Sequence, residues 1–196
     1  EPAHEIGALG LARTFQLLRL YQDMSVINNV MSGYHTKVPY SFAAAVLGRK
    51  KIWDHEKKIK DEMMELLSFV GLADFAEMNA SELSGGQRRL LVLARAIAGK
   101  PKLLMLDEPA AGLSPHNVDN LMKIIMQLKD KYGLTLIIIE HILKVVMDTC
   151  DTVTVFDHGQ KIAEGAPAKV KDDNAVIEAY LGKKMNDEEM RKALAV

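Results

Sequence analysis

The chain has 196 residues, of which 48% are hydrophobic and 26% are charged, and its formal net charge is -1. These proportions exclude global disorder and allow an apolar core of ordinary size for one domain, or for a domain with an attached lobe. The balanced charge excludes a strong electrostatic attraction to nucleic acid or anionic lipid, so we expect no nucleic-acid partner. The apolar runs are too short to span a membrane, and the single Cys150 and the absence of a signal peptide favour a reducing cytosol. We interpret Cys150 as a small buried hydrophobic residue.

The first part of the chain predicts a helical lobe. Between residues 54 and 69, apolar side chains recur at helical spacing among lysines and glutamates, which indicates an amphipathic helix. Basic residues in and around this helix could face a membrane surface, but a solvated helix face explains them as well, so we assign them no function. They are Arg49, Lys50, Lys51, Lys57, Lys58 and Lys60.

From residue 102 onward, short apolar runs alternate with helical stretches. The continuous runs at 103–106, 134–139 and 153–156 favour strands buried on both faces of a parallel sheet, with connecting helices at 118–128 and 141–147. Gly133 stands where the first of these helices would end, and residues 157–160 predict a tight hairpin turn before a strand at 161–164. The fold class is therefore α/β.

Two segments in this half of the chain carry chemistry. Ser-Gly-Gly at residues 84–86 stands directly before a predicted helix at 87–98, and the N-terminus of a helix favours an anion such as phosphate. Taken alone, these three residues are more often an ordinary helix cap in a flexible loop. Asp107 and Glu108, however, follow a buried strand, and open parallel sheets bind their ligands at that edge. The two segments together favour a phosphate-facing site.

The signature Leu-Ser-Gly-Gly-Gln at 83–87, followed by a Walker B strand at 103–108, resembles the ATP-binding cassette (ABC) family. Further pieces match in the family's order: Gln16 resembles the Q-loop glutamine, His141 resembles the switch histidine, and residues 111–114 occupy the D-loop position. As isolated residues, this glutamine and this histidine would carry no functional meaning. The resemblance covers about residues 6–182 and implies a P-loop NTPase-like cassette with a parallel sheet and an inserted α-helical subdomain.

The resemblance also implies how the chain is divided. Residues 1–18 would be the Q-loop region of the catalytic core, and residues 19–83 would be the helical subdomain. Residues 84–182 would form a RecA-like core with the signature, Walker B, D-loop and switch histidine. The charged segment 183–196 would be a C-terminal tail, which we expect to be a loosely attached helix.

The family resemblance implies a role for each site residue, with ATP and Mg²⁺ as cofactors. Asp107 would hold Mg²⁺ through water, Gln16 would touch the metal and the water, and Glu108 would polarise the attacking water. His141 would reach the γ-phosphate. Hydrolysis would need two cassettes facing each other, so a monomer should be inactive. The positions implied to bind ATP in this arrangement are Ser84, Gly85, Gly86, Gln87 and Ser114.

No Gly-x-x-x-x-Gly-Lys-Ser/Thr segment occurs in the sequence. In the family this phosphate cradle lies upstream of the Q-loop, so we expect that the N-terminal part of the cassette is missing from this sequence. Two adjacent carboxylates without the cradle would repel ATP. We therefore expect the full-length protein to be an ATP hydrolase and the 196-residue chain alone to be inactive.

Finer resemblance points to the ATPases of branched-chain amino-acid importers, with urea and other amino-acid importers close by. It rests on residues 10–16, 24–26, 109–115 and 179–182. The resemblance implies a peripheral subunit at the cytoplasmic face of the cell membrane. Its implied partners are a second ABC ATPase subunit, in a homo- or heterodimer, the integral membrane permease subunits and, indirectly, a periplasmic or extracellular solute-binding protein.

Two alternatives to a transport motor stay open. One is a soluble non-transport ABC ATPase, such as a translation or repair factor, which would favour tandem cassettes and basic nucleic-acid surfaces. The other is a nucleotide-incompetent truncated cassette that serves as a scaffold. The interval between Gln16 and Ser84 suits a compact helical lobe and is too short for the coiled-coil arm of chromosome-maintenance ATPases, which favours the transport motor. The sequence does not identify the transported solute.

Overall fold

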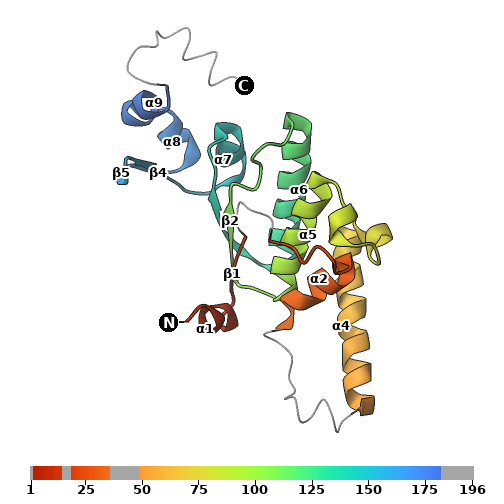
Figure 1. Ribbon diagram of the computed structural model, residues 1–196. Coiled ribbons are helices and arrows are strands. Elements are labelled where there is room, and N and C mark those ends of the chain that lie inside the picture. The colour runs from red at the N-terminus through yellow and green to blue at the C-terminus, as the bar shows by residue number, and fades with distance from the viewer. Residues whose placement is uncertain (1, 15–18, 36–48, 182–196) are drawn as a thin grey trace. The chain divides into compact units, whose positions relative to one another are not determined.

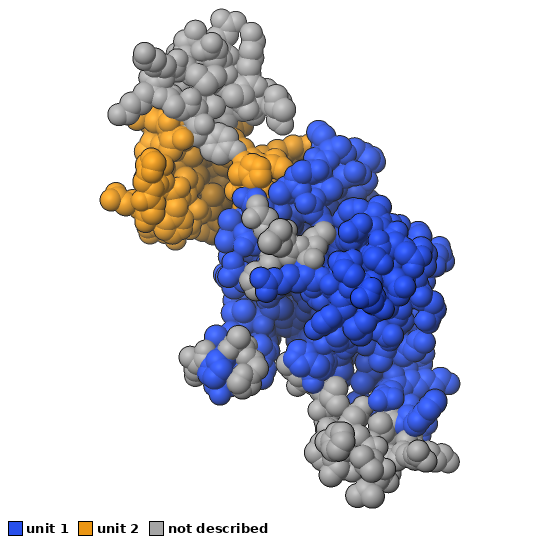
Figure 2. Space-filling model, in the orientation of Figure 1, with its two compact units in different colours: residues 1–139 blue, residues 140–196 orange. Residues whose placement is uncertain are grey.

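The computed structural model describes residues 2–14, 19–35 and 49–181. The chain divides into two compact units, Glu1–Ile139 and Glu140–Val196, which Figure 2 shows in blue and orange. The first unit contains a three-stranded sheet and the second a two-stranded sheet. The division falls inside the expected core range of 84–182. The expected limits of the helical subdomain, the core and the tail stay a prediction.

The first unit is built on a parallel sheet with the strand order β1-β2-β3 (Figure 1). These strands are β1 (Leu11–Arg13), β2 (Leu103–Asp107) and β3 (Thr135–Ile139). In the central strand, Leu104 pairs with Ala12 on one side and with Leu136 on the other. The parallel sheet that the sequence predicts is therefore confirmed for the runs at 103–106 and 134–139. The run at 153–156 is not part of it, because β4 (Val153–Asp157) pairs antiparallel with β5 (Gln160–Gly165) in a separate two-stranded sheet.

The expectation that these strands are buried on both faces is wrong for β3. Exposure alternates along this strand, and Ile137 and Ile139 are 44% and 52% exposed. On β2, by contrast, Leu104 and Leu106 are buried on the face that carries α5 (Gly85–Ala98) and α6 (Pro115–Tyr132). Successive side chains of a strand point to opposite faces of the sheet. An unbroken apolar run therefore does not reveal whether both faces are covered.

The helical part of the first unit packs against α5. Helix α2 (Val26–Gly33) contacts both α5 and α4 (Arg49–Phe69), and the predicted helix at 54–69 is confirmed as part of α4. The turns η2 (Ala73–Phe75) and η3 (Ala80–Glu82) lead from α4 to α5, and α1 (Ala3–Ala8) precedes β1. The buried apolar residues of α2 and α4 include Val26, Ile27, Val30, Ile59, Met63, Leu66 and Leu67. Over 2–14, 19–35 and 49–181, no helix is both long and apolar enough to cross a membrane.

Over its described residues, 140–181, the second unit is a hairpin with three short helices. These elements are α7 (Leu143–Thr149), β4 (Val153–Asp157), β5 (Gln160–Gly165), α8 (Pro167–Lys171) and α9 (Asn174–Leu181). The predicted tight turn is confirmed, because His158 and Gly159 have φ of 45° and 80°, which suits a two-residue hairpin. Cys150 packs partly buried against a core formed by Val153 and Val170, as expected of a small hydrophobic side chain.

Helices α2 and α5 approach each other closely at Gly33. A β-carbon at this position would stand 2.0 Å from the carbonyl oxygen of Arg95 and 3.2 Å from the β-carbon of Ala98. Only glycine fits this contact without a shift of one helix backbone.

We predict that Gly33→Ala lowers the free energy of unfolding by roughly 1–3 kcal/mol, because the added methyl group overpacks the contact between the two helices. Chemical denaturation measures this change. Gly7→Ala is the control, because a β-carbon at Gly7 in α1 would meet nothing within 4 Å, and we expect no loss of stability there. Equal stabilities of the two variants would contradict the close approach.

Candidate functional site

Asp107 lies at the carboxyl end of β2, where an arginine of the neighbouring strand contacts it. Arg13 pairs with Met105 in the sheet register, so its side chain leaves the same face of the sheet as that of Asp107. The Nη2 of Arg13 donates to Oδ2 of Asp107 at 2.9 Å, and the two side chains are 47% and 25% exposed. An ion pair this open to water contributes little to stability. The ion pair matters because it places the guanidinium of Arg13 beside Asp107, a predicted metal ligand.

Glu108 has an unusual backbone conformation directly after β2. Its φ of 45° lies in the left-handed region, which costs a residue with a side chain on the order of 1 kcal/mol or more. Two hydrogen bonds hold it there. Its N–H donates to the carbonyl of Ile139 at 2.9 Å, and its own carbonyl accepts from the N–H of Ala111 at 3.2 Å. Glu108 is therefore fixed between the end of β3 and the loop before α6.

The signature segment forms the N-terminus of α5. Oγ of Ser84 accepts a hydrogen bond from the N–H of Gln87 at 3.3 Å, and Oε1 of Gln87 accepts one from the N–H of Ser84 at 2.9 Å. This reciprocal capping box fixes the first turn of the helix. β-Carbons at Gly85 and Gly86 would meet nothing within 4 Å, so the backbone between the capping residues is open to a ligand. The helix-cap and phosphate-facing interpretations of this segment are thus compatible.

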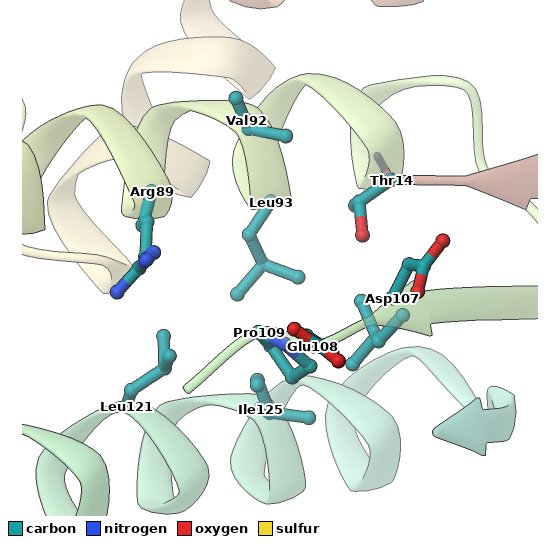
Figure 3. Close-up of a pocket in the computed structure, with 10 residues that line it drawn as sticks. Thr14, Arg89, Val92, Leu93, Asp107, Glu108, Pro109, Leu121 and Ile125 are labelled. Atoms are coloured by element: carbon teal, nitrogen blue, oxygen red, sulfur yellow. The ribbon is translucent and has the colours of Figure 1, made fainter. Parts of the chain in front are cut away.

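A small cavity lies between α5, α6 and the end of β2 (Figure 3). Its volume of about 30 Å³ is enough for roughly one water molecule. Arg89 enters the cavity from α5, and its Nη2 donates to the carbonyl of Ala111. A side chain of the signature helix therefore contacts the loop that follows Glu108. The cavity is lined by Thr14, Arg89, Val92, Leu93, Leu106, Asp107, Glu108, Pro109, Leu121 and Ile125.

The remaining predicted site residues belong to other elements of the chain or lie outside the described residues. His141 belongs to the second unit, where its backbone N–H donates to Oε2 of Glu140 at 3.2 Å. Ser114 is the N-cap of α6, and Pro115 follows it at the first position of the helix. Gln16 falls within residues 15–18, outside the described residues. The structure brings Asp107 and Glu108 together at one cavity with the signature helix beside it.

The described acidic residues suit a nucleotide-bound Mg²⁺ better than a metal cage made of protein side chains. Over 2–14, 19–35 and 49–181, no three or more His, Cys, Asp or Glu side chains form a metal-binding group. Mg²⁺ takes one or two protein carboxylates and fills its other positions with phosphate oxygens and water. Asp107, partly exposed at the end of a strand, can supply one such oxygen if Arg13 gives up part of its contact.

Sequence reasoning assigned no role to Arg13 or Arg89. The position of Arg13 beside Asp107 depends on the register of β1 against β2, which no local pattern shows. Arg89 had a weak signal, because it stands three and four residues before the buried Val92 and Leu93, on the face of α5 that turns inward.

Asn29 organises the loop before α2, and no sequence motif predicts this role. Its side chain is fully buried, and Nδ2 donates to the carbonyls of Tyr21, Met24 and Ser25 at 2.9, 3.2 and 3.1 Å. Oδ1 accepts from the N–H of Tyr21 at 3.0 Å. The guanidinium of Arg95 lies 5.7 Å from the Tyr21 ring centroid, and burial lowers the pKa of Arg95 below its ordinary value. The loop therefore has a fixed backbone, while the Tyr21 side chain is 55% exposed.

We predict that Asn29→Ala lowers the free energy of unfolding by about 2–4 kcal/mol, because it leaves buried backbone groups of the loop without their partner. Asn28→Ala, at the exposed neighbouring position, should change stability by less than about 0.5 kcal/mol. Thermal and chemical unfolding measure both variants. Similar effects at the two positions would show that the Asn29 side chain does not hold the loop.

Comparison with known proteins identifies the family of this fold. The sequence profile described as "ABC transporter" matches residues 8–111, and the profile described as "Branched-chain amino acid ATP-binding cassette transporter" matches residues 160–184. The high-affinity branched-chain amino acid transport ATP-binding protein BraF of Pseudomonas aeruginosa is 36% identical over 181 residues. The corresponding LivG protein of Escherichia coli is 34% identical. Both alignments cover 92% of this chain and 71% of the relative.

A solved structure agrees with these relatives. The ADP conformation of MJ1267, an ATP-binding cassette of an ABC transporter, superposes with a TM-score of 0.75 at 32% sequence identity. The match covers 93% of this chain and 72% of that protein. The chain therefore belongs to the ABC transporter family of ATP-binding proteins, whose full-length members are ATPases, and it has the α/β fold of an ABC cassette.

Proposed function

We propose that this chain is the ATP-hydrolysing subunit of an importer for branched-chain amino acids. Its main structural support is the position of Asp107 and Glu108 at the end of β2, with the signature helix lining the same cavity. The solute class is supported by the names of the relatives BraF and LivG and by the profile match at 160–184. ATP-driven pairing of two cassettes would be coupled to movement of a membrane permease.

Glu108 would act as the general base, or positioning group, for the attacking water. Phosphoryl transfer depends on in-line orientation and charge stabilisation more than on covalent help from the protein. A group with this task needs a fixed position, and the backbone of Glu108 is held by Ile139 on one side and Ala111 on the other. These bonds fix the point at which the side chain leaves the backbone and so limit the region that its carboxylate can reach.

Asp107 would hold Mg²⁺ through water, and Gln16 would contact the same ion and the attacking water. When bound, Mg²⁺ neutralises part of the phosphate charge. His141 would reach the γ-phosphate. These roles come from the family resemblance, and the open carboxylate of Asp107 is compatible with them.

The signature segment would contact the ATP held by a second ABC ATPase subunit, in a homo- or heterodimer. The open backbone at Gly85 and Gly86 supports this role, because an anion can approach the N–H groups of the first helical turn. Ser84 and Gln87 would shape the turn through their capping box. Ser114, the exposed N-cap of α6, would contribute from the D-loop.

As such a subunit, the protein would lie peripherally at the cytoplasmic face of the cell membrane. The helical subdomain, residues 19–83, would present the surface that integral permease subunits contact. The loop of Tyr21 and Met24 supports this assignment, because Asn29 fixes its backbone while both side chains are partly exposed. A periplasmic or extracellular solute-binding protein would act indirectly, through the permease.

We predict that Glu108→Gln in an ATPase-active form of the protein leaves ATP binding intact and slows turnover by about 10²–10⁴-fold, because the amide cannot accept the proton of water. The ATP-bound dimer should accumulate. Steady-state hydrolysis measures the rate, and size-exclusion chromatography with ATP measures the dimer. Glu77→Gln, on an exposed side chain that pairs with Lys60, serves as the control and should hydrolyse ATP normally. Parental turnover in Glu108→Gln would exclude the assigned role.

We also predict that a cysteine at Tyr21 or Asp23 crosslinks to a cytoplasmic helix of the permease in the assembled transporter. Each crosslinking variant should also carry Cys150→Ser, which removes the native thiol. A cysteine at Ile137, exposed on the sheet, is the comparison position and should stay unlinked. Crosslinks that form only at position 137 would place the permease on the sheet instead of the lobe.

A further inference from the structure

Arg89 contacts a different segment from its neighbour Arg88. Nε of Arg88 donates to the carbonyl of Leu83 at 2.8 Å, which ties α5 to the residue just before its own N-cap. Arg89 reaches away from α5, and its guanidinium donates to the carbonyl of Ala111 in the loop after β2. Figure 3 shows Arg89 and Glu108 at the same cavity, one on the helix and one on the loop. Arg89 is therefore a direct link between two parts of the candidate site.

The link continues through the backbone of the loop. The N–H of Ala111 donates to the carbonyl of Glu108 at 3.2 Å, and the N–H of Glu108 donates to the carbonyl of Ile139 at 2.9 Å. A series of hydrogen bonds thus runs from the Arg89 guanidinium to the end of β3. The left-handed φ of Glu108 persists only while its surroundings hold it, and the Arg89 bond is part of those surroundings.

The other end of the link is the signature segment. Ser84 caps α5, and Arg89 follows five residues later, about 7.5 Å along the helix axis at 1.5 Å per residue. The helix is anchored at its N-terminus by the capping box and, beyond Arg89, by buried side chains such as Leu91 and Ala94. A packed helix moves as a unit, so a displacement of its first turn reaches Arg89.

We infer, on the basis of the function proposed above, that Arg89 is a positioning residue that couples the signature segment to the catalytic loop of the same subunit. When the signature segment engages the nucleotide of the second cassette, α5 carries Arg89 with it, and Arg89 sets the loop that fixes Glu108. The bond from a charged donor to the Ala111 carbonyl is stronger than one between neutral groups. The cavity has room for roughly one water, so water can replace the lost donor only in part.

The first test measures the loop itself by hydrogen exchange in the 196-residue chain. Arg89→Met keeps the apolar stem and removes every donor, and it should speed exchange of the Glu108 and Ala111 amides at least tenfold. Arg89→Lys, which can still donate, should lie between Arg89→Met and the parent. Arg88→Met is the matched control and should leave these two amides at the parental rate. Parental exchange in Arg89→Met would overturn the inference.

The second test measures coupling in an ATPase-active form of the protein. Arg89→Met should lower kcat about tenfold and change KM for ATP less than twofold. Ser84→Ala combined with Arg89→Met should cost less than the product of the two single effects, because both act through one link. Multiplicative effects would overturn the inference, since they indicate separate roles. If Arg89→Met does not fold, Arg89→Leu, which also lacks a donor, replaces it and carries the same expectations.

The two tests separate this inference from the proposed function. If Glu108→Gln hydrolyses ATP at the parental rate, the function assigned to Glu108 fails, whereas the exchange experiment still reports on the loop. If Glu108→Gln is inactive and Arg89→Met retains full kcat, the proposed function stands and the coupling role of Arg89 is excluded.

Discussion

The pairing of the ends of β2 and β3 is the constraint on which the candidate site depends. The ladder between these strands runs in register to Asp107 and Ile139, and the N–H of Glu108 adds one further bond to Ile139. Glu108, whose φ lies in the left-handed region, is the point at which the chain leaves the sheet and begins the loop that leads to α6. Because the sheet is parallel, β1 brings Arg13 to the same edge. A defect in this pairing would disturb both carboxylates together.

Helix α5 connects the rest of the first unit to that edge. Its inner face lines the cavity beside β2, its N-terminus carries the signature segment, and its C-terminal half meets α2 at Gly33. Helix α5 therefore packs against both the sheet and the helical lobe. Gly33 permits the close contact with the lobe, and Arg89 makes the contact with the loop. Changes in the lobe and in the loop are consequently linked by one rigid element.

The features that the sequence predicted are those with local patterns. Strands and helices followed from apolar runs and periodicity, and Gly133 marked the end of α6 because its φ of 62° suits glycine. Ser84 and the two carboxylates were predicted as site residues because their neighbours in the chain form motifs. The predicted burial of both faces was wrong for β3 and β4, and the predicted parallel pairing was wrong for β4, since an apolar run does not report what packs on each face or which strand lies beside it. Arg13, Arg89 and Asn29 were missed as contributors because their partners lie on other segments or depend on a loop conformation.

The surroundings of the two adjacent carboxylates suit them to different tasks. Asp107 has a cation beside it and stays partly open to water, so a divalent cation could take over the contact of Arg13 without first uncovering a buried charge. The backbone of Glu108 is held in place by its main-chain hydrogen bonds to Ile139 and Ala111. These two bonds do not involve its carboxylate or an ion. A metal ligand has to exchange one positive partner for another, whereas a group that orients water has to stay where the main chain puts it. The cavity wall near Glu108 is largely apolar, with Pro109 and Ile125 beside it, so a water held there would depend on the few polar groups of the lining, Glu108 among them, for its hydrogen bonds. In the proposed function, Asp107 would therefore exchange Arg13 for the metal ion, while the next residue, Glu108, would position water from a backbone held at the end of the sheet.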